Sequence, residues 1–77
     1  MKINVLLFGI LTDIAGTSHI ELKDVESVSA VKSWLWRNYP KSKDIDFQIA
    51  VNKQIIDGKV DLKNGDEVGL LPPFAGG

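Results

Sequence analysis

The sequence predicts an α+β fold with a mixed sheet of about five strands and one main helix. Apolar residues alternate with a period of two near both ends of the chain, at 2–9 and 66–71, which indicates strands. Between them, Val28, Val31 and Leu35 recur at three- and four-residue spacing, which indicates a helix with one apolar face. A chain of 77 residues has room for one domain with one core, so the helix is expected to cover one face of a single sheet.

Two strands are predicted in the first third of the chain. In the strand at 2–9, alternation separates two faces, with Ile3, Val5 and Leu7 on one and Asn4, Leu6 and Phe8 on the other. The pattern breaks at 12–16, which ends in glycine and predicts a turn or a single helical turn. It resumes at 18–22, and the short connection predicts an antiparallel pair.

The main helix is predicted to begin after Ser27, whose hydroxyl suits the N-cap position, and to end before Pro40. Its buried face consists of residues spaced three and four apart: Val28, Val31, Leu35 and Tyr39, with Trp34 at the edge. Trp36 lies off this stripe, so its side chain is expected to be half exposed.

The second half of the chain predicts the remaining strands. Alternation at 47–51 indicates a third strand that turns at Asn52-Lys53 and resumes at Ile55-Ile56. Two turn signals, Asp57-Gly58 and Asn64-Gly65, enclose residues 60–62, which are expected to form a loop or a brief strand. In the last strand, 66–71, alternation again separates two faces, with Val68 and Leu70 on one and Glu67, Gly69 and Leu71 on the other.

This order of elements is typical of a β-grasp (ubiquitin-like) roll. In that fold the first and last strands lie parallel at the centre of the sheet, joined by a right-handed crossover that contains the helix. We expect residues 1–71 to form the domain and residues 72–77 to form an extended tail that ends in Gly-Gly.

Composition excludes several kinds of function. Nine basic against ten acidic residues leave a net charge of −1, which disfavours nucleic acid and anionic membranes as partners. With no cysteine and with His19 as the single histidine, neither a metal site nor a bound cofactor is expected, and His19 is interpreted as a surface residue. No apolar run approaches a membrane span and no signal sequence opens the chain, so a cytoplasmic location is expected.

The tail is the unusual feature of the sequence. Pro72 and Pro73 cannot donate hydrogen bonds to a sheet, so the last strand is expected to end there. Gly76 and Gly77 lack side chains and fit a narrow channel, which leaves the terminal carboxylate as the reactive group. A carboxylate can attack the α-phosphorus of ATP when another protein positions both, and a sulfur donor can then displace AMP to leave a thiocarboxylate.

These residues carry a resemblance to a known family. Residues 64–68, Asn-Gly-Asp-Glu-Val, and residues 71–77, Leu-Pro-Pro-Phe-Ala-Gly-Gly, resemble the ending of molybdopterin synthase small subunits, within the MoaD/ThiS ubiquitin-like family. Residues 5–9 and 50–52 are similar to the same family in order and spacing. The Gly-Gly end is shared with ubiquitin-like modifiers and thiamine-pathway carriers, whereas the double proline is more particular to this family. Many relatives carry Arg-Glu where this chain has Thr12-Asp13, so their salt bridge is not carried over.

The resemblance implies a sulfur carrier that is no enzyme on its own but the sulfur-donating subunit of a heterotetrameric molybdopterin synthase. Its implied partners are an E1-like adenylyltransferase that uses ATP, a sulfur donor protein and the larger synthase subunit. Gly77 would become the thiocarboxylate that gives sulfur to the pterin precursor in molybdenum cofactor biosynthesis. The implied docking positions comprise three on the domain, Phe8, Ile55 and Leu71, and four in the tail, Pro72, Pro73, Phe74 and Ala75.

Alternation supports the docking surface independently of the resemblance. Because one helix cannot cover both faces of the sheet, Leu6, Phe8 and Leu71 are expected to form an exposed apolar patch on adjacent central strands, which usually marks a partner surface. Three other functions remain open: a sulfur carrier of a thiamine thiazole or amino-acid pathway, a ubiquitin-like modifier joined to lysines through Gly77, and a binding module with an inert tail.

Overall fold

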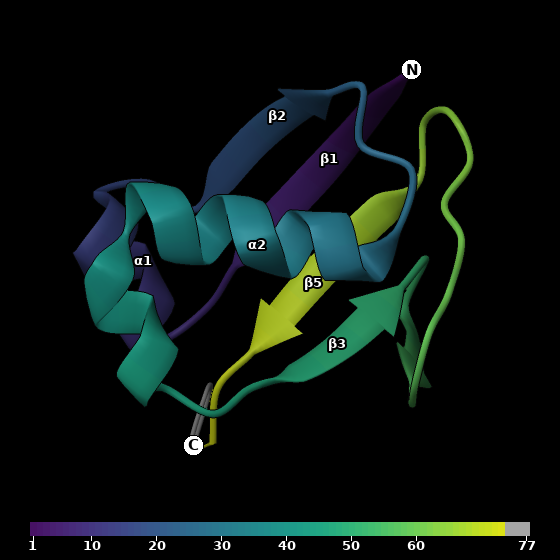
Figure 1. The fold of residues 1–77 in the computed structure, drawn as a ribbon. Coiled ribbons are helices and arrows are strands. Elements are labelled where there is room, and N and C mark those ends of the chain that lie inside the picture. Colours follow the sequence, from purple (N-terminus) through teal and green to yellow (C-terminus); the bar gives the residue numbers. More distant parts are fainter. Residues whose placement is uncertain (74–77) are drawn as a thin grey trace.

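Within residues 1–73, which the computed structural model describes, five strands form one mixed sheet in the order β2-β1-β5-β3-β4 (Figure 1). The strands are β1 (Lys2–Leu7), β2 (His19–Lys23), β3 (Gln48–Val51), β4 (Gln54–Ile56) and β5 (Glu67–Leu71). β1 and β5 are parallel neighbours at the centre, and the other neighbouring pairs are antiparallel. This topology confirms the predicted β-grasp fold.

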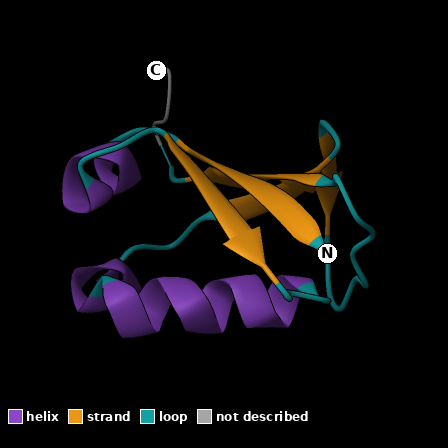
Figure 2. Ribbon diagram, turned by 90° about the horizontal axis from the view of Figure 1, so that it is seen from above, coloured by secondary structure: helices purple, strands orange, loops and turns teal. Residues whose placement is uncertain are grey.

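Helix α2 (Val28–Asn38) lies across one face of this sheet (Figures 1 and 2). Ser27 caps it as predicted, because its Oγ accepts a hydrogen bond of 3.1 Å from the backbone N–H of Ala30. The helix ends at Asn38, two residues before Pro40. Trp36 is half-buried, as expected from its position off the apolar stripe.

The core lies between α2 and the sheet. Alternate residues of the two central strands point into it, and Ile3, Val68 and Leu70 are completely buried. The helix contributes Val28, Val31 and Leu35, which are all buried. Each fully buried aliphatic side chain of this kind contributes about 1.5–3 kcal/mol to folding. The predicted inward faces of strands 2–9 and 66–71 are therefore confirmed.

The turn predicted at 12–16 is a short helix, α1 (Ile10–Ala15), which begins two residues earlier than the sequence pattern indicates. β1 correspondingly ends at Leu7 rather than at residue 9, because Gly9 adopts a φ of 56° and redirects the chain. Gly16 ends α1 with a φ of 74°, in the left-handed region where glycine is favoured.

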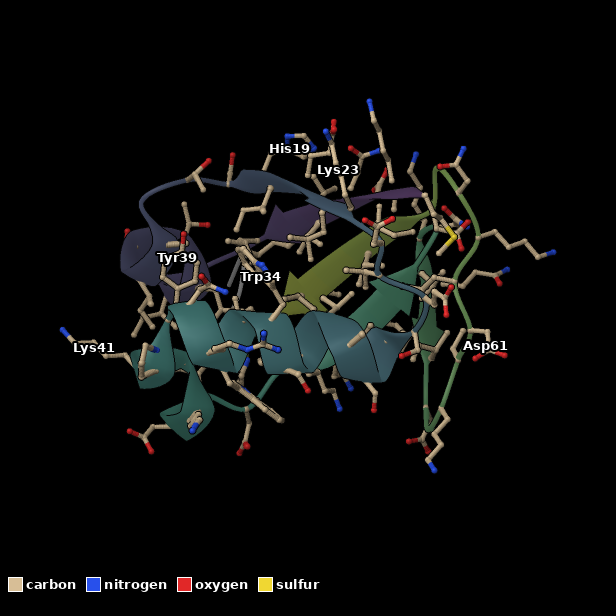
Figure 3. The ribbon with its side chains drawn as sticks, turned by 45° about the horizontal axis from the view of Figure 1, so that its top comes forward. His19, Lys23, Trp34, Tyr39, Lys41 and Asp61 are labelled. Carbon is tan, nitrogen blue, oxygen red and sulfur yellow. The ribbon has the colours of Figure 1, made fainter. Side chains whose placement is uncertain are left out.

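A 3-10 helix, η1 (Pro40–Asp44), follows α2 and was not predicted. Its Ser42 is completely buried, and the Ser42 Oγ donates a hydrogen bond of 2.6 Å to the carbonyl oxygen of Tyr39. Tyr39, expected on the buried face of the helix, is instead its C-terminal cap and is partly buried. Its ring packs edge-on against Trp34 with centroids 5.9 Å apart (Figure 3).

The connection between β4 and β5 contains both predicted turns. Gly58 and Gly65 each adopt a φ of 86°, a backbone conformation that residues with a side chain rarely adopt. Residues 60–62 form no named strand, but Asp61 makes a single bridge with Ser27 at the start of α2. Leu62 is buried against the core, so this connection closes the end of the domain.

Candidate functional site

The sheet face opposite α2 carries a row of residues that crosses all five strands. The register places these residues side by side in the order His19, Leu6, Gly69, Ala50 and Ile55. Gly69 and Ala50, at the middle of the row, have the smallest side chains. The surface is therefore lower between β5 and β3 than on either side.

Phe8 lies beside this low point. A Cβ atom added to Gly69 would lie 3.6 Å from Cε2 of Phe8 and 3.9 Å from Cβ of Ala50. The aromatic ring therefore packs against bare glycine backbone and forms one wall of a groove. Gly69 is buried, although it points away from the core, because these neighbours cover it.

The groove has a volume of about 200 Å³. Its apolar lining consists of Leu6, Phe8, Ala50, Ile55, Gly69 and Leu71. Phe8 is 39% exposed and Ile55 is 56% exposed, which are large fractions for side chains of this size. The structure thus brings together the three predicted docking residues of the domain, and Leu6 with them. Their role in binding a partner stays a prediction.

Two charged residues, Lys53 and Glu67, complete the lining of the groove. Lys53 stands in the two-residue turn between β3 and β4, where Asn52 has a φ of 50° and Lys53 a φ of 72°. Positive φ at both positions is the pattern of a type I′ turn, whose second position favours glycine. Alternation had placed Glu67 on the same strand face as Leu71, but neither charged residue was among the predicted site residues.

Asn52 joins this turn to the start of β5. Its side-chain oxygen accepts a hydrogen bond of 3.0 Å from the backbone N–H of Glu67, and its Nδ2 donates one of 3.0 Å to Asp66. The second oxygen of Asp66 accepts a hydrogen bond of 2.7 Å from the backbone N–H of Lys63. The hydrogen bond from Asn52 and that from Lys63 hold the pKa of the Asp66 carboxyl below its ordinary value of 3.8.

Asn64 and Gly65 connect the same segment to β1. The Asn64 side-chain oxygen accepts a hydrogen bond of 2.8 Å from the backbone N–H of Lys2, and the Gly65 N–H donates one of 2.7 Å to the Lys2 carbonyl. The Asn-Gly-Asp-Glu segment, residues 64–67, which is part of the family resemblance, therefore has a structural role. It fixes the turn, β1 and β5 in the register that forms the groove.

β5 leads directly from the groove to the tail. Leu71 is the last residue of the strand and is partly exposed, Pro72 is buried and Pro73 is exposed. The predicted site residues Phe74, Ala75, Gly76 and Gly77 lie outside the described residues.

His19 is exposed, as expected, and lies on β2 at the end of the row (Figure 3). Its Nε2 is 3.2 Å from Oδ1 of Asn4. Within residues 1–73, no cluster of three or more histidine, cysteine or acidic side chains could hold a metal ion. Over the same residues, no helix is long and apolar enough to cross a membrane.

Comparisons with known proteins find similarity over the whole length of the chain. The chain is 32% identical to the molybdopterin synthase sulfur carrier subunit of Mycobacterium tuberculosis, covering 100% of this chain and 99% of that one. In a Helicobacter pylori complex of molybdopterin-converting factor subunits 1 and 2, a chain with a TM-score of 0.77 is 26% identical, with 100% of both chains covered. Small archaeal modifier protein 1 of Methanosarcina acetivorans has a TM-score of 0.79 and 28% identity, covering 99% of this chain and 96% of that one.

The model of the ThiS family matches residues 5–77, which include both β-strands of the groove centre and the tail. The match agrees with the resemblance to molybdopterin synthase small subunits that residues 64–68 and 71–77 indicated. This chain therefore belongs to the ThiS family.

Proposed function

We propose that this protein is the sulfur carrier subunit of a molybdopterin synthase. Its Gly77 carboxylate is activated by an E1-like adenylyltransferase, converted into a thiocarboxylate and presented to the larger synthase subunit, which docks on the groove. The full-length similarity to the M. tuberculosis sulfur carrier subunit and to a chain of the H. pylori complex of subunits 1 and 2 supports this proposal. The cytoplasmic location and the heterotetrameric assembly stay predictions.

The observation that carries the proposal is the continuity between the groove and the tail. Leu71 lines the groove and is also the residue from which the tail departs. Six residue steps separate Leu71 from Gly77, and an extended chain of that length spans about 20 Å. A partner held by the groove is thus within reach of the Gly77 carboxylate, and the reacting group arrives without a separate encounter.

The chemistry follows from the carboxylate itself. A terminal carboxyl group has a pKa of about 3.5 and is ionised at neutral pH. Attack of one carboxylate oxygen on the α-phosphorus of ATP forms an acyl adenylate and releases pyrophosphate. Hydrosulfide can then attack the acyl carbon, with AMP as the leaving group, and leaves a thiocarboxylate. The activating enzyme binds ATP and positions its α-phosphorus beside the carboxylate, so this chain needs no cofactor of its own.

Intact-mass analysis tests the carrier chemistry. The protein is incubated with the adenylyltransferase that activates it, ATP and sulfide, and one terminal oxygen should be replaced by sulfur. A variant that lacks Gly77 is the matched control and should gain no sulfur. Sulfur at any residue other than Gly77, or none with a confirmed activating enzyme, would contradict the proposal.

A second candidate function is attachment to other proteins. The similarity to the M. acetivorans modifier, over nearly the whole of both chains, favours it. The same acyl adenylate would then yield an isopeptide bond between Gly77 and a lysine of a target protein. Mass spectrometry of tryptic peptides from cells that express the tagged protein distinguishes the two functions, because a branched lysine peptide arises from the modifier reaction alone.

A further inference from the structure

Lys53 occupies a backbone conformation that its side chain disfavours. The turn that joins β3 to β4 contains two residues with positive φ, and the second of them favours glycine. At φ 72°, the Cβ atom of a lysine crowds the neighbouring backbone. The first turn residue, Asn52, suits its position and anchors the turn through two side-chain hydrogen bonds. Within residues 1–73, the Lys53 side chain makes no hydrogen bond that would offset this strain.

The same residue is the cation of the groove. Lys53 is exposed and lines the groove beside the apolar Phe8, Ile55 and Leu71. In the part of the chain that the structure describes, the ion pairs are Met1 with Asp24 and Lys2 with Glu21, so Lys53 belongs to neither. An exposed ammonium beside an apolar surface becomes partly desolvated when a partner covers that surface. Such a charge strengthens binding when the partner brings a carboxylate to it and weakens binding when it does not.

We infer that Lys53 determines partner specificity at the groove, by pairing with a carboxylate that the docked protein places beside the turn. This inference rests on the proposed function, because it concerns the larger synthase subunit that uses the groove. The turn places Lys53 in the lining of the groove, and the apolar walls supply the contact area. The partner therefore presents an apolar side chain to the floor formed by Gly69 and Ala50 and an acidic residue next to it.

Glu67 provides the competing explanation. It also lines the groove, so Lys53 could act simply by neutralising this carboxylate within the same chain. The two side chains form no ion pair within 4.0 Å in the structure. A double-mutant cycle separates the explanations. If Lys53 serves Glu67, replacing Lys53 by glutamine has no effect once Glu67→Gln is present, whereas a pair with the partner keeps its effect in that background.

The experiment measures binding of a molybdopterin synthase large subunit to wild-type protein and to Lys53→Gly, Lys53→Gln and Lys53→Glu. Removal of the charge is expected to weaken binding about threefold at low salt, as for a partly exposed ion pair. Charge reversal is expected to weaken it about tenfold. Both differences should shrink as salt is added, because screening acts on the charge. Lys41→Gln, which removes an exposed lysine from η1, is the matched control and should bind like wild type.

Lys53→Gly adds a readout that a purely structural role would not give. Glycine relieves the turn strain, so the midpoint of urea unfolding should stay or rise while binding falls. Equal binding by wild type and all three Lys53 variants would overturn this inference and leave the proposed function standing. An effect of Lys53→Gln that vanishes in the Glu67→Gln background would also overturn it. Absence of binding by the wild type would overturn the docking part of the proposed function and this inference together.

Discussion

The ring of Phe8 packs against the backbone of Gly69, so that an added Cβ atom at position 69 would lie 3.6 Å from Cε2 of Phe8. This is an ordinary van der Waals distance, which means that the position accepts alanine without a clash. What glycine provides here is therefore not backbone freedom. It keeps the floor of the groove low beside Phe8 and Ala50, where the proposed partner would place a side chain.

Gly69→Ala is accordingly expected to separate stability from binding. Alanine in a strand interior is favoured over glycine by about 0.5–1 kcal/mol, so the free energy of unfolding should stay level or rise. Binding of the large subunit should weaken about tenfold, which corresponds to about 1.4 kcal/mol, because the methyl group occupies the groove floor. Urea unfolding and titration calorimetry measure the two effects. The exposed Ser29→Ala on α2 is the control, and unchanged binding by Gly69→Ala would show that the floor is not used.

Leu70 and Leu71 are neighbours in β5 that point to opposite faces. Leu70 is completely buried in the core, whereas Leu71 is partly exposed and lines the groove. Leu71→Asp should therefore leave the circular dichroism spectrum intact and cost a few kcal/mol of binding, as the loss of an interface hot spot does. Leu70→Asp should unfold the domain, because it buries an unpaired charge. An unfolded Leu71→Asp would place Leu71 in the core and contradict the docking surface.

The strand faces could be predicted because alternation alone decides them. Ile3, Val5 and Val68 point into the core as expected, since each strand has one apolar face and one helix to cover it. The helix start was equally predictable, because Ser27 is a good N-cap and its hydrogen bond needs nothing beyond the next turn. Expectations of this kind depend on residues close together in the sequence.

The groove floor could not be predicted, because it depends on which strands become neighbours. Gly69 and Ala50 form a low point only through the antiparallel register of β3 and β5, which pairs these two residues although they lie 19 positions apart in the sequence. The Asn52–Asp66 hydrogen bond likewise spans two turns that the sequence presents as separate. The helix η1 was missed for another reason: Pro40 ends α2 but does not reveal that buried Ser42 stabilises a further turn.

Asp66 predicts how stability depends on pH. Because the pKa of its carboxyl in the folded protein lies below 3.8, the ionised form stabilises the fold. This contribution is complete above the ordinary pKa and is lost as pH falls through the lower, folded-state pKa. Asp66→Asn should therefore destabilise the domain by about 1 kcal/mol near pH 7, because an amide has one acceptor oxygen and can keep only one of the two hydrogen bonds that the carboxylate accepts. The difference from wild type in urea unfolding should shrink below pH 3.8.

A matched substitution tests whether this effect belongs to the hydrogen-bond network. Asp46 is exposed, and in the described part of the chain its side chain makes no hydrogen bond. Asp46→Asn should leave the stability near pH 7 within about 0.5 kcal/mol of wild type. If Asp66→Asn behaved in the same way at every pH, the network would not contribute to stability.

The last prediction separates the molybdopterin pathway from the thiamine pathway. Two prolines follow Leu71, and fixed backbone angles at the root of a tail lower the entropy lost when it enters a partner. A molybdopterin synthase large subunit should therefore bind this protein before any chemistry and, with the Gly77 thiocarboxylate, convert the pterin precursor to the dithiolene. A thiazole synthase should do neither well. Reconstitution of the thiocarboxylate form with each enzyme, followed by product analysis, measures this, with the form that lacks Gly77 as the inactive control. Turnover with thiazole synthase but not with the molybdopterin synthase subunit would assign the protein to the thiamine pathway. Its function as a sulfur carrier would be unaffected by that result.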